Sequence, residues 1–226
     1  LGRLARPVDG EPYFDELLRP LIIAHMSYAE DEEVIAKLRK LCDDATTPAD
    51  IWGDIRSVVF ANAVKFGDEA AFDRLLDWYK STSSAEQRTQ LTAGLTTSRD
   101  PKLIQRALGM LTTDDVKLQD LFYWIAGLLR NRFARDVTWR WMQDNWQWIL
   151  DHFGNDLHYT DFPKYAASAF SKPEQLESYK AFFGPMQDKP GIGRAIAQSI
   201  EDIEGRIQWI GRDGSSRVCC LPFPGV

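Results

Sequence analysis

The amino-acid sequence predicts an all-α protein. Apolar residues recur at helical spacing along nearly the whole chain, helix-start motifs return at short intervals, and almost no segment alternates like a strand. Tightly joined helix pairs of roughly 30–45 residues are typical of α-solenoids. We therefore predict an α-α superhelix of antiparallel helix pairs of the HEAT or armadillo kind. No sequence repeat is visible, and a compact helical bundle is the structural alternative.

Helix starts are marked by capping residues, which accept hydrogen bonds from free backbone amides. Acidic residues lead and basic residues follow over 31–40, which complements a helix dipole. Thr47 and Pro48 open a helix, and Gly67 followed by Asp68 predicts a tight antiparallel hairpin. Further starts are predicted at 99–101, at 113–115, and at two capping boxes, Ser83 with Glu86 and Ser171 with Glu174.

The last helix carries the clearest pattern. Isoleucines recur three or four positions apart on one face, which predicts a long amphipathic helix with Ile192, Ile196, Ile200, Ile203, Ile207 and Ile210 in its apolar stripe. We expect one helical domain over 13–212, between a Gly- and Pro-rich linker at 1–12 and an irregular tail at 213–226. The sequence starts with Leu1 rather than Met, and we expect it to be cut from a longer protein.

Composition limits the possible partners. The net charge of −6 argues against nucleic acid, because phosphate binding needs a concentrated positive field, whereas peptides and proteins remain possible. No apolar run approaches the roughly 18 residues that suggest a membrane span, and none is predicted. Three cysteines, Cys42, Cys219 and Cys220, are too few for a disulfide framework. We therefore expect a reducing compartment, the cytoplasm.

Motifs for catalysis are largely absent. None of the three histidines, His25, His152 and His158, stands in the H-E-x-x-H pattern of helical zinc sites. The sequence also has no nucleophile elbow, phosphate loop or dinucleotide fingerprint. We expect this chain to be inactive by itself, with no catalytic residue, bound metal or cofactor of its own.

The stretch "WRWMQDNWQW" (139–148) holds four of the eight tryptophans. On a helix, Trp139, Met142, Trp146 and Ile149 share one face, and Trp141 and Trp148 lie on another. A helix apolar over so wide an arc is usually buried between neighbours. A platform that stacks ligands is the alternative, although a surface that stacks bases would also need interleaved basic residues.

Several segments, in order, resemble the C-terminal helical domain of the aminopeptidase N family of zinc metallopeptidases, which includes puromycin-sensitive and endoplasmic reticulum aminopeptidases. They include "TWRWMQDNWQWILDHFG", "VKLQDLFYWIAGLLRN", "AFSKPEQLESYKAFF" and "AIAQSIEDIEGRIQWIGRD". The resemblance covers about residues 1–213, and the tail "GSSRVCCLPFPGV" departs from it.

The resemblance implies one part of a larger enzyme. In this family, the zinc, its H-E-x-x-H helix and the exopeptidase motif belong to an upstream catalytic domain. The C-terminal domain caps that domain, encloses a chamber and limits the access of peptides. The resemblance thus implies two partners for this chain, the catalytic domain of the same polypeptide and peptide substrates.

A peptide's terminal carboxylate would need a cation on such a cap, preferably an arginine. Arg130 and Arg132 flank Asn131 where the family's Arg-Asn falls, and they are the candidate substrate-binding residues. Alternatively, Arg130 caps its own helix or pairs with Asp120 or Asp136. A free-standing HEAT-like scaffold that binds proteins is the competing function, and a start codon at Leu1 would favour it.

Overall fold

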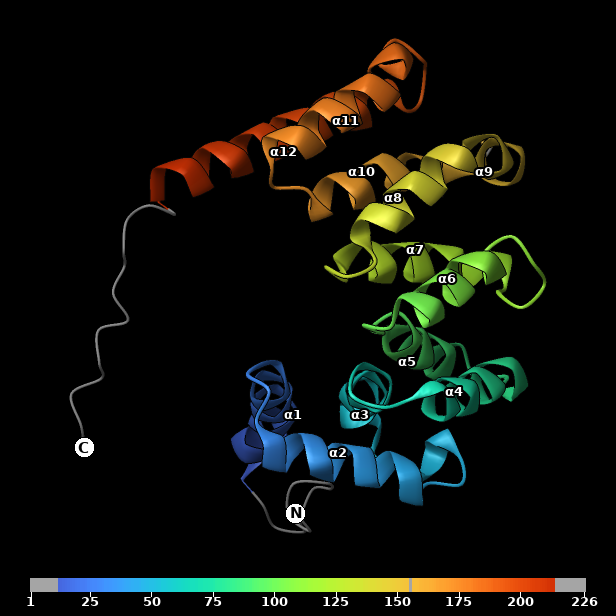
Figure 1. The fold of residues 1–226 in the computed structure, drawn as a ribbon, viewed down its shortest axis with the longest axis vertical. Coiled ribbons are helices and arrows are strands. Elements are labelled where there is room, and N and C mark those ends of the chain that lie inside the picture. The colour runs from blue at the N-terminus through green and yellow to red at the C-terminus, as the bar shows by residue number, and fades with distance from the viewer. Residues whose placement is uncertain (1–11, 155, 214–226) are drawn as a thin grey trace. The chain divides into compact units, whose positions relative to one another are not determined.

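The computed structural model describes residues 12–154 and 156–213, whose helices are drawn in Figure 1. These residues form helices and turns with no strand among them, so the predicted all-α class is confirmed. The predicted linker at 1–12 and tail at 213–226 lie outside the described residues, apart from Pro12 before the first helix and Asp213 at the end of the last. No described helix combines the length and the apolar composition that crossing a membrane requires.

The chain divides into two compact units, Leu1–Thr138 and Trp139–Val226. The first holds α1 (Tyr13–Tyr28), α2 (Glu32–Asp44), η1 (Pro48–Asp50), α3 (Gly53–Lys65), α4 (Glu69–Ser81), α5 (Ala85–Leu95), α6 (Pro101–Met110), η2 (Leu118–Asp120) and α7 (Leu121–Arg130). The second holds α9 (Trp146–Phe153), η3 (Leu157–Thr160), α10 (Asp161–Ala169), α11 (Pro173–Phe183), η4 (Gly184–Met186) and α12 (Gly193–Asp213). The boundary between the units falls within α8 (Arg135–Asp144).

In the first unit, the odd-numbered helices α1, α3, α5 and α7 pack one on the next, while α2 and α4 pack on α3 and α5. The tightest approach lies between α3 and α5, where a Cβ built on Gly94 would lie 2.6 Å from the Cβ of Phe60. Fully buried side chains such as Phe60, Leu75, Leu91 and Trp124 fill the core. Consecutive helices therefore form hairpins, and the packing of one hairpin on the next brings residues that are distant in the sequence together.

Several predicted helix starts are confirmed. Asp31 accepts a hydrogen bond from Val34 N at 2.9 Å and caps α2. Asp68 caps α4 directly after the turn at Gly67, and Asp100 caps α6 with Pro101 as its first residue. Thr47 and Pro48 begin the short η1 rather than α3 itself. Capping side chains thus locate the starts of α2, α4 and α6.

Three predicted starts are wrong. Ser84, not Ser83, caps α5, because its hydroxyl accepts the Gln87 amide at 3.3 Å. Helix α11 begins after Lys172, and Gln175 rather than Glu174 accepts the backbone amides before it. Residues 113–115 form a turn, and the next helical residues start at Leu118. Adjacent polar residues offer capping oxygens one position apart, and sequence alone does not choose between them.

The tryptophan-rich stretch lies in the aromatic core of the second unit. Trp139, Met142, Trp146 and Ile149 are buried as predicted, whereas Trp141 and Trp148 are only partly buried. The stretch is two helices rather than one, because α8 ends at Asp144 and α9 starts at Trp146. The rings of Phe182 and Phe183 pack against both Trp139 and Trp146. Core packing therefore accounts for the face that carries Trp139 and Trp146.

The isoleucine stripe of α12 is buried only in its first part. Ile196 and Ile203 are fully buried, whereas Ile210 is exposed. Arg206 donates to the carbonyl oxygens of Ala167 and Phe170 and so ties this helix to the end of α10. The predicted long amphipathic helix is confirmed from Gly193 on, its last turns leave the core, and the predicted stripe residue Ile192 is buried in the turn just before it.

Candidate functional site

The two candidate arginines lie at the turn between α7 and α8. Arg130 is the last residue of α7, and both Arg130 and Arg132 are exposed. Among the described residues, no ion pair engages Arg130, and Asp120, one of its possible partners, contacts Arg88 and Tyr79 instead. The guanidinium of Arg132 lies over the Phe133 ring at 4.9 Å. Both cations are thus accessible on the surface of the first unit.

Asn131 holds this turn in place. Its side-chain amide donates to the carbonyl oxygens of Thr96 at 3.0 Å and Ser98 at 2.7 Å, both after α5. Its side-chain oxygen accepts the Phe133 amide at 3.0 Å. A side chain that bonds the neighbouring hairpin in this way fixes the backbone that carries Arg130 and Arg132. In the sequence, Asn131 shows only its position between the two arginines, and nothing there predicts these bonds to residues 33 and 35 positions earlier.

A cluster of charged and aromatic residues joins four hairpin turns of the first unit. We call it the turn cluster: Glu30, Lys65, Phe66, Arg99, Arg132 and Phe133. Arg99 lies over the rings of Phe66 at 5.0 Å and Phe133 at 5.4 Å, and its guanidinium pairs with Glu30. Lys65 lies 3.4 Å from the same carboxylate. The turn cluster thus carries three cationic side chains, Lys65, Arg99 and Arg132, and one anionic side chain, Glu30, and two of the cations contact that carboxylate.

Glu30 is the anionic centre of this cluster. The hydrogen bond from Arg99 holds the pKa of the Glu30 carboxyl below its usual value, and Lys65 acts in the same direction. The Glu30 backbone has a φ of 60°, a left-handed conformation that is uncommon for residues other than glycine. Its two cationic neighbours stabilise the side chain at this turn between α1 and α2. Lys65 lies 35 positions after Glu30 and Arg99 lies 69 positions after it, so sequence spacing gives no sign of these contacts.

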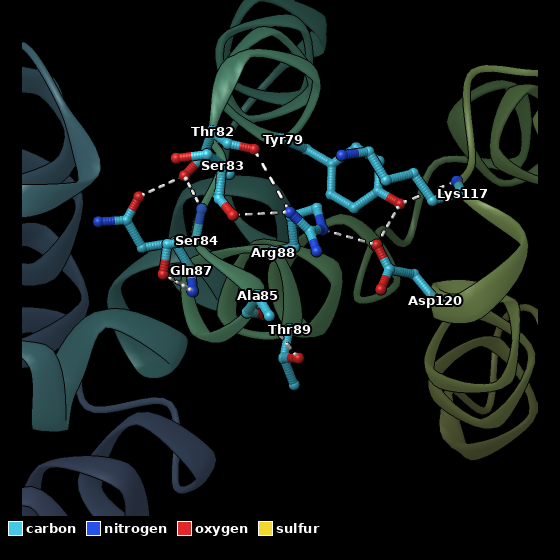
Figure 2. Close-up of polar contacts among 10 residues, drawn as sticks. All are labelled: Tyr79, Thr82, Ser83, Ser84, Ala85, Gln87, Arg88, Thr89, Lys117 and Asp120. Carbon is cyan, nitrogen blue, oxygen red and sulfur yellow. Dashed lines mark hydrogen bonds and ion pairs between the residues drawn. The ribbon is translucent and has the colours of Figure 1, made fainter.

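A second polar group, buried near the starts of α5 and α7, is drawn in Figure 2. Asp120 accepts hydrogen bonds from Arg88 Nε at 3.0 Å and from the Tyr79 hydroxyl at 2.9 Å. Arg88 also donates to the carbonyl oxygens of Thr82 and Ser83. Burial raises the pKa of Tyr79 to about 12, so the hydroxyl keeps its proton at neutral pH. Arg88, Tyr79 and Asp120 are hydrogen-bonded to one another and to backbone groups, as buried polar side chains usually are. This buried group therefore stabilises the packing of α4 and α5 against the residues just before α7.

The described part of the chain gathers no metal ligands. Within 12–154 and 156–213, no three His, Cys, Asp or Glu side chains come together in a group that could hold a metal ion. Cys42 is a buried free thiol whose pKa is raised to about 11 by burial, so it is a poor nucleophile at neutral pH. Cys219 and Cys220 lie outside the described residues.

The fold and the site define a class of protein: an all-helical domain that exposes a cationic turn and, among its described residues, gathers no group that could hold a metal ion. Residues 2–205 match the family model described as "ERAP1-like C-terminal domain". The chain therefore belongs to the ERAP1-like C-terminal domain family. The resemblance inferred from the sequence is confirmed.

Curated relatives support this assignment. The chain is 30% identical to aminopeptidase N of Lactobacillus helveticus over 213 residues, which cover 93% of this chain and 25% of the relative. It is 32% identical to aminopeptidase N of Lactococcus lactis subsp. lactis (strain IL1403), over 90% of this chain and 24% of the relative. Aminopeptidase M1 of Arabidopsis thaliana is 26% identical, over 90% of this chain and 24% of the relative. The chain thus spans about a quarter of the length of these relatives.

Proposed function

We propose that this chain is the C-terminal cap domain of a zinc-dependent aminopeptidase. The catalytic zinc domain lies upstream in the same polypeptide, and the cap encloses a chamber and controls which peptides reach it. The observation that carries the proposal is the family match over residues 2–205, together with relatives named aminopeptidases that are about four times as long. A helical array can supply the broad surface that such a cap needs.

The coding DNA upstream of Leu1 provides the first test. We expect an open reading frame that encodes H-E-x-x-H with a downstream glutamate, in frame with this chain. The complete polypeptide should hydrolyse aminoacyl amides only when zinc is bound, and this chain alone should not. A start codon just before Leu1 with no upstream frame would overturn the proposal and favour the free-standing scaffold.

Arg130 and Arg132 bind the terminal carboxylate of longer peptides in this proposal. Both side chains are exposed, and Arg130 has no ion pair with any residue of 12–154 or 156–213. Asn131 bonds the turn that carries them to the residues after α5. A bidentate arginine is well suited to a carboxylate. The distance from this turn to the zinc would then set which peptide lengths are bound at both ends.

The matched test uses charge reversal in the complete enzyme. Arg130→Glu with Arg132→Glu should raise KM for longer peptides roughly tenfold, as expected for the loss of a charge-assisted hydrogen bond, while single-residue amides are cleaved as before. Arg39→Glu, at an exposed position on α2, is the control and should leave both substrates unchanged. Equal losses on peptides and amides would remove these arginines from the proposal.

We also place the parent enzyme in the cytoplasm. The free thiol of Cys42 and the low number of cysteines support a reducing compartment. Fractionation of the cells that produce it, with activity measured in each fraction, tests this placement. Activity recovered mainly outside the cytoplasm would overturn it.

A further inference from the structure

The first helix exposes an unusual amount of apolar surface. Of the thirteen large hydrophobic side chains that are exposed among the described residues, eight lie on α1. They are Tyr13, Phe14, Leu17, Leu18, Leu21, Ile22, Met26 and Tyr28, with Phe14 71% and Leu21 57% exposed. Monomeric proteins seldom leave so continuous an apolar patch in water. The patch therefore marks a surface that is covered in the working protein.

Five of these residues make up what we call the α1 outer face: Phe14, Leu17, Leu18, Leu21 and Ile22. Their spacing of three and four places them on one side of the helix. Ile23, which is buried in α1 together with Ser27, stands nine positions after Phe14, which is about two and a half turns and so the opposite side. The helix is thus apolar on both sides, a pattern typical of a helix buried between two neighbours.

The inner side of α1 already has its neighbours. The helix packs on α2 and α3, and the Asn62 side chain donates to the Ser27 hydroxyl at 2.7 Å. This buried hydrogen bond fixes the rotation of α1 about its own axis. The outer face therefore cannot turn inward without breaking it, and its cover must come from another part of the protein or from a partner.

A lipid surface fits this helix poorly. Helices that lie on membranes carry basic residues on their polar face, which attracts anionic lipids. Helix α1 carries two acidic residues, Asp15 and Glu16, and only Arg19 and His25 as basic ones, so no row of basic side chains lies along it. The centre of the outer face carries no charge, which is typical of the core of a protein interface.

We propose that the α1 outer face is a docking surface for the part of the same polypeptide that precedes this domain. This inference rests on the proposed function, and it names the surface through which the cap is held. The family match is to a C-terminal domain, and the relatives are about four times as long, so an upstream neighbour would be covalently linked close to α1. A covalent link gives that neighbour a high effective concentration at α1. Permanent protein interfaces are also more apolar than transient ones, which agrees with the apolar α1 outer face.

The test uses the complete polypeptide with a protease site inserted within residues 1–12. After cleavage, the wild-type parts should stay associated on size exclusion. The double variant Leu17→Gln, Leu21→Gln should raise the dissociation constant at least about tenfold, because it places polar groups in the interface core. The control is Leu118→Gln with Tyr123→Gln, which alters two exposed hydrophobic residues of the same unit outside α1 and should have no effect.

Several outcomes overturn the inference. Wild-type parts that separate on cleavage, or a double variant that stays associated like the wild type, would do so. A variant that abolishes only self-association of this chain would assign the outer face to a second copy instead. Circular dichroism checks folding, and Phe14→Gln replaces the double variant if that variant unfolds. A missing upstream zinc domain would refute the proposed function before any cleavage, whereas unaffected association in a confirmed zinc enzyme refutes this inference alone.

Discussion

Arg88 and Asp120 form a buried ion pair in the first unit, with 3.0 Å between Arg88 Nε and Asp120 Oδ2 and side chains only 6% and 8% exposed. The pair joins α5 to the start of α7 across 32 positions of sequence. The Tyr79 hydroxyl completes the group from α4 and also accepts the Lys117 amide (Figure 2). The Asp120 carboxylate thus links α4 and α5 to the residues just before α7.

Removing that carboxylate should destabilise the protein strongly. Asp120→Ala leaves the Arg88 charge buried without its partner, which costs about 3–5 kcal/mol in comparable cases. Asp115→Ala is the control, since Asp115 pairs with Lys80 at 2.7 Å but both side chains are more than 40% exposed. Such a surface pair contributes about 0–1 kcal/mol. Urea unfolding of both variants measures the difference, and similar losses would contradict the structural role given to Asp120.

The space around two glycines predicts opposite effects for Gly→Ala substitutions, one at Gly94 in α5 and one at Gly109 in α6. At Gly94, a new Cβ would lie 2.9 Å from the backbone carbon of Phe60, which cannot move freely, and overpacking of this kind costs about 1–3 kcal/mol. At Gly109 in α6, nothing lies within 4 Å, so Gly109→Ala should stabilise by up to about 1 kcal/mol through helix propensity. Thermal unfolding of both variants checks the two signs. A stabilised Gly94→Ala protein would show that the helices are farther apart than described.

The lowered pKa of Glu30 predicts a pH-dependent contribution to stability. A carboxyl group with a lower pKa in the folded state stabilises the protein above its unfolded pKa, near the usual value of 4.5, and loses that contribution as pH falls through the lowered folded value. Wild type should therefore exceed Glu30→Gln in stability at pH 6, and the gap should close in the acidic range below 4.5. Glu201→Gln, an exposed position on α12, is the control. A gap that persists unchanged at the lowest pH would exclude the ion pairs of Glu30 as its cause.

The aromatic core of the second unit predicts unequal effects for neighbouring tryptophans. Trp146 is buried among Phe162, Phe182 and Phe183, and Trp146→Ala should cost about 3–5 kcal/mol. Trp148 is partly buried and stacks on His152 with 4.1 Å between ring centres, so Trp148→Ala should cost clearly less. Denaturant unfolding followed by far-ultraviolet circular dichroism gives both values. Equal costs would mean that both faces of this stretch are packed in solution.

The sequence predicts much of this fold because local chemistry determines much of it. Apolar spacing identifies the buried faces of the tryptophan-rich stretch and of α12, and Asp31, Asp68 and Asp100 mark helix starts through their own side chains. The break between α8 and α9 escapes prediction, because the apolar spacing continues across Asn145.

The site is less predictable because its contacts are distant in sequence. Arg130 and Arg132 can be placed at a turn, yet the bonds from Asn131 to Thr96 and Ser98 depend on how two hairpins pack. The buried Arg88 offers one usable signal. It stands three and seven positions before Leu91 and Leu95, on the apolar stripe of α5, where a charged residue needs a partner. Sequence spacing alone does not identify Asp120 as that partner.

The bonds that Asn131 makes also bear on how this family can vary in length. Its amide group spans two carbonyl oxygens of the preceding hairpin, while its oxygen receives the amide of Phe133 two positions on. One inserted or deleted residue between 131 and 133 would pull that ring away from Arg99 and break the last of these bonds. Evolutionary insertions and deletions should therefore avoid this turn, and grafted loops or affinity tags will be tolerated better elsewhere in the chain.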